Sequence, residues 1–202
     1  MAEVRPLEFH EGEMAVDLMV PIVREIPWHQ WLLGDAAGNA EVERWLIELQ
    51  LIEHLRQGYV LGGFDGGELV GMLMWSPAEP YTAQPEPEFE DRSIELLMRH
   101  PELVARLAEF RRCNAENRFG PPDVEVVLAG YTPRMRGTDL AAALLGPAFD
   151  AARMAGSRVW MATAAESFGA SALRRFGGQK ACEYLIGPVT MHVYRTSQLA
   201  AT

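Results

Sequence analysis

The sequence predicts an α/β (α+β) fold, in which helices flank a central, mostly antiparallel sheet of about six to seven strands. Stretches with helical periodicity alternate along the chain with short runs rich in β-branched and aromatic residues. Two such runs, Tyr59–Phe64 and Glu68–Trp75, flank Asp65-Gly66-Gly67, which supplies the positive φ angles of a tight hairpin turn. A strand, a helix and a strand over residues 123–163 predict one parallel pair.

The N-terminal part is expected to form a strand and two helices. Val4–Phe9 favours a short strand, and an apolar helix follows from about Gly12 to Arg24, where Pro27 ends it. A second helix begins near Asn39, and Gly58 closes it. Its apolar residues repeat at intervals of three and four: Val42, Trp45, Leu46, Leu49 and Ile52. This stripe is expected to face the core.

Residues 77–121 are interpreted as an insertion within a single domain that spans residues 1–202. Prolines and acidic residues between Pro77 and Phe89 predict an extended loop. A helix over Ser93–Asn117, bent or broken near Pro101, is expected next. The hairpin before this segment would be marginally stable alone, which argues against reading the loop as an interdomain linker.

The C-terminal part completes the predicted sheet. The expected elements are strands at Asp123–Tyr131 and Ser157–Thr163, helices at Thr138–Ala155 and Ser167–Arg175, and a closing hairpin of Gln179–Ile186 and Val189–Arg195 around Gly187-Pro188. Pro147 is expected to kink the first of these helices.

Composition and charge limit the classes of function. Hydrophobic residues make up 49% of the chain and charged residues 23%, so a folded globular protein is expected. The formal net charge of −10 argues against nucleic-acid binding, which requires many Lys and Arg side chains. No apolar run approaches the roughly 20 residues of a membrane helix, so a soluble protein without a membrane partner is expected. Two cysteines, Cys113 and Cys182, and no recognisable leader before Val4 predict reduced thiols in the cytoplasm.

The most informative stretch is Tyr131–Leu145, Tyr-Thr-Pro-Arg-Met-Arg-Gly-Thr-Asp-Leu-Ala-Ala-Ala-Leu-Leu, which predicts a strand end, a basic turn and a helix start. A helix N-terminus carries unpaired N–H groups and about half a positive charge, so it binds phosphate. Asp139 opposes this, because a carboxylate about 4 Å from a phosphate costs about 1 kcal/mol at water-like screening and about 4 kcal/mol at an effective dielectric near 20. The alternative is that Asp139 only stabilises a helix beginning near Thr138.

The order of elements and this turn resemble the GNAT superfamily of acyl-CoA-dependent N-acyltransferases. The resemblance is most specific over residues 126–178, where Ala-Leu-Leu-Gly-Pro and Leu-Arg-Arg-Phe-Gly-Gly follow the turn. In the family, a turn of the form Gln/Arg-x-x-Gly-x-Gly/Ala wraps the CoA pyrophosphate. The resemblance therefore implies contacts, largely through backbone N–H groups, from Arg136, Gly137, Thr138, Asp139, Leu140 and Ala141. Asp139 stands where the family has glycine, and a register beginning at Arg134 would end on Asp139.

The resemblance implies an N-acetyltransferase that transfers acetyl from acetyl-CoA to a small amine by direct attack in a ternary complex. Glu125, on the predicted strand, is a candidate base, although it is equally consistent with a solvated residue on the alternate face. Trp28, His29 and Trp31 lie in the segment that the family uses to wall the acceptor pocket, where aromatic rings hold an amine. Their alternative role is packing at a helix end.

Leu173 is a second departure from the family pattern, since many members have a tyrosine there that protonates the departing thiolate. Ser167, Ser171 or water would then fill that role. The rival hypothesis is a degenerate GNAT fold that acts as a ligand-binding or interaction module. A third hypothesis is transfer of a longer acyl group, or modification of a protein N-terminus or lysine.

Other candidate groups have simpler interpretations. Tyr81, Glu86, Glu88 and Glu90 either cover the acceptor site or form a charged, solvated loop. His54, His100 and His192 have no Cys or His partners at metal-ligand spacing, so no metal is expected. Homodimerisation through the terminal strands is a hypothesis that no residue pattern establishes.

Overall fold

The computed structural model describes residues 2–79, 87–117, 119, 123–165 and 175–199. A seven-stranded sheet lies at its centre, with the strand order β1-β2-β3-β4-β5-β7-β6. Its strands are β1 (Glu3–Pro6), β2 (Val60–Asp65), β3 (Glu68–Ser76), β4 (Val124–Tyr131), β5 (Val159–Thr163), β6 (Gln179–Ile186) and β7 (Val189–Arg195). Among these strands, only β4 and β5 pair in parallel. The predicted mixed, mostly antiparallel sheet is therefore confirmed.

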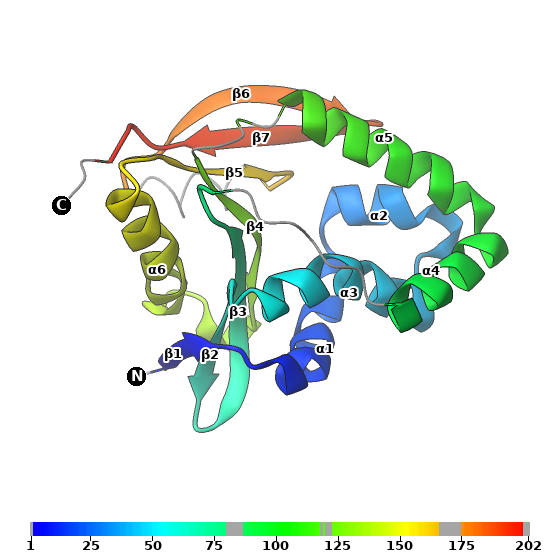
Figure 1. The fold of residues 1–202 in the computed structure, drawn as a ribbon, viewed down its shortest axis with the longest axis horizontal. Helices are drawn as coiled ribbons and strands as arrows, with labels where there is room; N and C mark the ends of the chain where they lie inside the picture. The colour runs from blue at the N-terminus through cyan, green and yellow to red at the C-terminus, as the bar shows by residue number, and fades with distance from the viewer. Residues whose placement is uncertain (1, 80–86, 118, 120–122, 166–174, 200–202) are drawn as a thin grey trace.

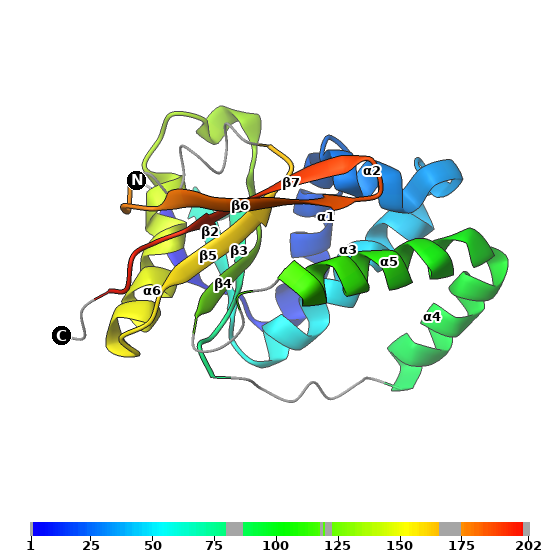
Figure 2. The same cartoon turned by 90° about the horizontal axis from the view of Figure 1, so that it is seen from above.

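Helices cover both faces of the sheet. They are α1 (Gly12–Val23), α2 (Pro27–Leu33), α3 (Ala40–Arg56), α4 (Pro87–Arg99), α5 (Pro101–Asn117) and α6 (Leu140–Met154), with short 3-10 turns η1 (Phe9–Glu11), η2 (Gly34–Ala36) and η3 (Pro133–Met135). Figure 1 shows α6 on one side of β2, β3 and β4, and α1 and α3 on the other side. Figure 2 shows α4 and α5 beyond α3, with α5 running beside the ends of β6 and β7.

Three apolar clusters hold these layers together. On one face, Leu144 and Phe149 of α6 pack on a cluster that includes Leu73 and Val126. On the other face, α1 and α3 form a second cluster with the alternate residues of the same strands, including Met19, Ile47, Met72 and Leu128. The third cluster joins α2, α3, α4 and α5 to the β6–β7 hairpin through residues such as Trp45, Leu96, Leu103, Ile186 and Met191. Of the residues predicted as the stripe of α3, Val42, Trp45 and Leu46 lie in the third cluster and Leu49 packs against it, whereas α3 joins the second cluster through Ile47, Leu51 and Leu55.

The sheet separates into two parts after its parallel pair. β4 and β5 are in register only at Val124–Val159, Glu125–Trp160 and Val126–Met161. Beyond that point β4 stays paired with β3, whereas β5 continues with β7. In Figure 1, β2, β3 and β4 run down the centre of the molecule while β5, β7 and β6 lie across its top. The divergence of β4 from β5 positions the candidate site.

Most predicted elements occur at their expected places, and the exceptions involve prolines. Pro27 was expected only to end the first helix, but it also begins α2, because its fixed φ suits a first helical position. Pro87 likewise begins α4 six residues before the predicted start at Ser93. The break near Pro101 is confirmed, since α4 ends at Arg99. The predicted strand Val4–Phe9 is shorter and shifted, as β1 ends at Pro6 and η1 follows.

Two expectations near the C-terminus have different outcomes. Pro147 was expected to kink the helix that follows the phosphate turn, and it lies within α6, which continues without a break from Leu140 to Met154. Of the predicted helix Ser167–Arg175, residues 166–174 lie outside the described residues, and Arg175 occupies a turn. The closing hairpin has the predicted bounds.

The turn of this hairpin is held between α2 and α5. Gly187 has a φ of +54°, and a Cβ added there would lie 2.3 Å from Nε1 of Trp31. The Gly187 N–H donates to Oε1 of Glu109 at 3.2 Å. The turn thus ties the third cluster to the end of the sheet.

We expect Gly187→Ala to destabilise the fold by about 3 kcal/mol, because it combines a left-handed backbone with a steric clash. Thermal unfolding should show a fall in Tm of roughly 10 °C. Gly66→Ala is the matched control, since Gly66 has a φ of +61° with no atom within 4 Å of the added Cβ. It should cost only about 1 kcal/mol. Equal losses in the two variants would show that Trp31 does not restrict the turn.

Candidate active site

A cleft of about 1040 Å³ opens where β4 and β5 diverge. Its walls come from β4 and β5, from the start of α2, from the C-terminal half of α3 and from α5. β4 contributes every residue from Glu125 to Tyr131, and β5 contributes Trp160 to Thr163. β4 therefore runs along the whole length of the cleft.

A β-bulge marks the point of divergence on β4. Met74 is opposite Leu128 and Trp75 is opposite Val126, so Val127 has no opposing residue on β3. The last β4–β5 pair is Val126 with Met161. Backbone groups of β4 beyond this pair are thus free of the β5 ladder and face the cleft. A bulge of this kind re-aims the backbone, so its polar groups are available to a ligand.

The predicted phosphate turn lies at one end of β4. Gly137 has a φ of +78°, which requires glycine for the sharp turn before α6. The Thr138 hydroxyl donates to the Met135 carbonyl at 2.7 Å and accepts from the Leu140 N–H at 3.3 Å. Arg136 is exposed and lines the cleft.

The first turn of α6 retains unpaired donors. Among the described residues, the N–H groups of Ala141 and Ala142 have no acceptor, as expected for a helix N-terminus. The Leu140 N–H, in contrast, donates to Thr138 Oγ1, and the Leu140 side chain is buried against the sheet. Unpaired N–H groups, an exposed arginine and the helix dipole make this turn suited to an anion.

Asp139 lies at the N-cap of α6, and its carboxylate does not cap the helix. Its Oδ1 is 3.0 Å from Nη2 of Arg175, and the side chain is 87% exposed. Arg134, which could have offset the charge, binds Glu68 at 2.7 Å. The carboxylate thus points into solvent toward Arg175, so it acts on the turn at water-like screening.

Glu125 lies in the middle of the β4–β5 pairing, between Val124 and Val126. Those two side chains pack with α6, so Glu125 lies on the α1 and α3 face of β4. Its cross-strand neighbours are Ser76 on β3 and Trp160 on β5. Glu125 is half-buried and lines the cleft. A carboxylate at this place can bind an ammonium group and accept its proton.

The three residues predicted for acceptor binding have different environments. Trp28 lines the cleft and stacks on Phe110, with ring centroids 4.8 Å apart. His29 is fully buried beside Trp28 and is not part of the cleft lining. Trp31 packs on the turn at Gly187. The structure therefore brings Trp28 to the same cleft as Glu125 and Arg136, while His29 and Trp31 lie behind it.

The sequence did not indicate several cleft residues that come from α5, in the segment predicted as an insertion, and from β6. Phe110, Arg111 and Asn114 of α5 line the cleft, as does Tyr184 of β6. The Tyr184 hydroxyl donates to Oδ1 of Asn114 at 2.7 Å, and burial raises the pKa of this phenol above its usual value. These side chains are far from Glu125 in sequence, so no local motif could have identified them.

Two residues of α3 and β3 form a further polar pair in the cleft. His54 Nε2 is 3.1 Å from Ser76 Oγ, and His54 Nδ1 is 2.7 Å from the Gln50 carbonyl oxygen. All three residues line the cleft. The only sequence signal was the spacing of Gln50 and His54, which are four residues apart on one helix.

Other candidates lie elsewhere. Glu88 and Glu90 are exposed on α4 and do not line the cleft. Tyr81, Glu86, Ser167, Ser171 and Leu173 lie outside the described residues.

Within the described ranges there is no group of three or more His, Cys, Asp or Glu residues that could hold a metal ion. No helix in the part of the chain that is described combines the length and apolar character needed to cross a bilayer.

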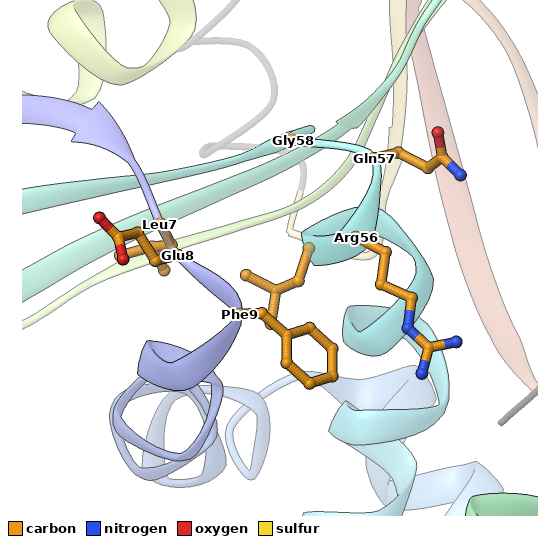
Figure 3. Close-up of a pocket in the computed structure, with 7 residues that line it drawn as sticks. Leu7, Glu8, Phe9, Arg56, Gln57 and Gly58 are labelled. Atoms are coloured by element: carbon orange, nitrogen blue, oxygen red, sulfur yellow. The ribbon is translucent and has the colours of Figure 1, made fainter.

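A second, smaller hollow of about 600 Å³ lies between η1 and the C-terminal end of α3 (Figure 3). Phe9 and Arg56 line it, with the guanidinium 5.4 Å from the ring centroid. It contains none of the predicted site residues, so the cleft beside β4 is the candidate site.

The buried His29 predicts a pH dependence of stability. Burial lowers the pKa of this imidazole from 6.5 to about 3, and both ring nitrogens lack partners among the described residues. The unfolded chain then binds a proton that the folded chain excludes, so the free energy of unfolding falls as pH drops below about 6.5. The slope approaches about 1.4 kcal/mol per pH unit.

His29→Leu should remove this dependence between about pH 6.5 and 5, above the range where carboxylates titrate. Urea unfolding at several pH values measures the slope, and His100→Gln is the control for an accessible histidine. Identical slopes in wild type and His29→Leu would contradict the assignment. At pH 7 the variant should be at least as stable, because it buries no unpaired ring nitrogen.

Comparison with solved structures places this geometry among known folds. A polyamine N-acetyltransferase from Drosophila melanogaster, which forms N-acetylagmatine, matches with a TM-score of 0.64 at 14% identity, over 96% of this chain and 99% of that chain. Arylalkylamine N-acetyltransferase 2 from Aedes aegypti matches with a TM-score of 0.59 at 12% identity, over 96% and 98% of the chains. A GNAT-family acetyltransferase from Bacillus cereus matches with a TM-score of 0.56 at 11% identity, over 98% and 99%. No protein-family model and no curated protein sequence matches the chain. The fold is therefore that of GNAT acetyltransferases.

Proposed function

We propose that this chain, which has the fold of GNAT acetyltransferases, transfers acetyl from acetyl-CoA to a small amine by direct attack in a ternary complex. The observation that carries the proposal is the cleft along β4, which joins an anion-binding turn to a carboxylate. Arg136 lies toward one end of this cleft and Glu125 toward the other, with the bulge at Val127 between them.

The proposed cofactor site follows from the donors at the start of α6. The CoA pyrophosphate would lie against residues Arg136–Ala141 and accept hydrogen bonds from the N–H groups of Gly137, Asp139 and Ala141, which have no acceptor among the described residues. The Arg136 guanidinium would add a charge-assisted contact. The pantetheine arm then follows the part of β4 that has left the β5 ladder. The carboxylate of Asp139 remains outside this contact, because Arg175 and solvent engage it.

The reaction requires a neutral amine and a polarised thioester. Glu125 binds the ammonium group and takes up its proton, directly or through water. The amine lone pair attacks the carbonyl carbon while a backbone N–H group near Val127 stabilises the developing oxyanion. The C–S bond then breaks, and the proton lost by the attacking nitrogen goes to the departing sulfur. The products are an N-acetyl amine and the CoA thiol.

The lining of the cleft supports a cationic acceptor with an apolar part. Carboxylates outnumber guanidinium groups among the described lining residues: Glu25, Glu53, Glu79, Asp123 and Glu125 against Arg111 and Arg136. Trp28 and Phe110 present stacked aromatic rings on the α2 and α5 side. We infer that the ammonium group faces Glu125 while the apolar part of the amine packs on these rings.

The cellular setting is proposed from composition. Cys113 and Cys182 are both free thiols, which suits a cytoplasmic protein. The net charge of −10 opposes binding to nucleic acid. We retain homodimerisation through the terminal strands as a proposal that sedimentation would test.

Isothermal titration with CoA tests the cofactor site. We expect wild type to bind CoA, and Asp139→Asn to tighten binding by no more than about fivefold, because an exposed carboxylate near a phosphate costs about 1 kcal/mol. Asp139→Gly, which also restores the glycine of the family pattern, should behave similarly.

Arg136→Gln is the opposing control and should weaken CoA binding, whereas Arg134→Gln should not, because Arg134 is engaged by Glu68. Tightening by 100-fold or more in Asp139→Asn would show that the carboxylate faces the ligand. Absence of binding at millimolar CoA would overturn the proposed function.

Glu125→Gln tests catalysis separately from binding. We expect acetyl-CoA affinity to change by less than twofold and kcat to fall by about 100-fold, because a neutral amide can neither hold the ammonium group as a counter-ion nor take up its proton. Free-thiol release with a panel of alkyl, arylalkyl and polyamines provides the measurement. CoA binding by wild type without thiol release on any amine would favour a ligand-binding module with the same fold.

A further inference from the structure

Beside Glu125, the cleft contains a hydrogen-bonded histidine and serine whose orientation is fixed. The Gln50 carbonyl, 2.7 Å from His54 Nδ1, can only accept, so Nδ1 carries the proton. In the neutral ring, Nε2 is then the basic nitrogen, and it accepts the O–H of Ser76 at 3.1 Å. The pair therefore has one defined direction, from the serine hydroxyl to the imidazole lone pair.

Ser76 lies between this imidazole and Glu125. Ser76 is the residue directly opposite Glu125 in the β3–β4 register, so the two side chains project from the same face of the sheet. Opposed side chains in an antiparallel pair have Cβ atoms about 5 Å apart. The backbone thus aligns a carboxylate, a hydroxyl and an imidazole along one wall of the cleft.

The proposed reaction requires a group that takes up the proton of the acceptor ammonium. An alkylammonium has a pKa of about 10.4 and an ordinary glutamate a pKa of about 4.3, so proton transfer between them is uphill by about six pKa units. Transfer to an imidazole near 6.5 is uphill by only about four. In this refinement of the proposed reaction, Glu125 remains the counter-ion that holds the ammonium, and an imidazole replaces it as the acceptor of the proton.

We propose, building on the acetyltransferase function above, that Ser76 and His54 form a proton relay for the acceptor amine held by Glu125. The ammonium gives a proton to Ser76 Oγ as the Ser76 O–H proton moves to His54 Nε2. The amine becomes neutral and His54 becomes an imidazolium. After the amide and the CoA thiol have formed, His54 releases its proton to solvent, and the neutral pair is restored.

The charges around the relay support its imidazolium state. The carboxylates of Glu25, Glu53, Glu79, Asp123 and Glu125 line the same cleft from the end of α1, from α3, from the end of β3 and from β4. Asp123 is bound to Arg195 and contributes less. Besides His54, the other titratable groups of the lining among the described residues are the guanidinium groups of Arg111 and Arg136 and the phenols of Tyr131 and Tyr184. The balance is acidic, which favours a positive charge on His54.

Steady-state kinetics of His54→Gln and Ser76→Ala test the relay. We expect kcat/KM for the amine to fall at least 100-fold in His54→Gln and about tenfold in Ser76→Ala, while the Kd for acetyl-CoA changes by less than twofold. An imidazole acceptor imposes an acidic limb on the kcat/KM profile at about pH 6 to 7. His54→Gln should lose this limb, and added imidazole should restore part of the activity of His54→Ala.

His100→Gln and Ser93→Ala are matched controls, because His100 lies between α4 and α5 and Ser93 pairs with Trp45, both outside the cleft lining. Both should keep wild-type rates, and Tm values would identify any loss of folding. Wild-type turnover with an unchanged pH profile in His54→Gln would overturn the relay and leave the acetyltransferase function standing. A wild-type protein that releases no thiol on any amine would overturn both.

Discussion

The parting of β4 and β5 after three residue pairs is the constraint on which the rest of the structure depends. A continuous parallel pair would leave no cleft and no free backbone along β4. The separation exposes backbone polar groups and apolar side chains of both strands, so each part of the sheet is stabilised by its own set of helices. α6 packs on both β4 and β5 from one face, whereas α1 and α3 cover β2, β3 and β4 from the other. The β6–β7 hairpin depends on α2 and α5 instead.

This division explains why the segment between β3 and β4 matters for the site. α4 is anchored to α3 by ion pairs and by the Trp45–Ser93 hydrogen bond, and α5 is anchored to β6 by the Tyr184–Asn114 hydrogen bond. They complete the third apolar cluster and place Phe110 against Trp28. The acceptor end of the cleft is therefore built by packing between distant segments, and its shape depends on their stability.

The turn before α6 and the rest of the cleft lining have opposite electrostatic character, which matches the two substrates proposed for the cleft. At the α6 end, unpaired N–H groups and Arg136 favour an anion, and the carboxylate of Asp139 is turned toward Arg175. Over the rest of the described lining, carboxylates outnumber guanidinium groups and favour a cation. Both substrates would then meet at the bulge on β4, where neither end group blocks the backbone.

The sequence by itself determined the order of the elements, the hairpin at Gly66, the β4–α6–β5 unit and the tight turn at Gly137, because each depends on local periodicity or on a residue with a restricted backbone. It also predicted that Glu125 lies on β4, since an alternating strand places it on a definite face, and its role as a base stays a proposal. It missed α2, because a proline read as a helix end was also a helix start. Only the tertiary structure decided that Trp28 reaches the cleft while His29 is buried behind it, that Asp139 meets Arg175, and that Ser76 aligns with His54 and Glu125. These relations depend on strand register and on packing between distant segments, which no local pattern encodes.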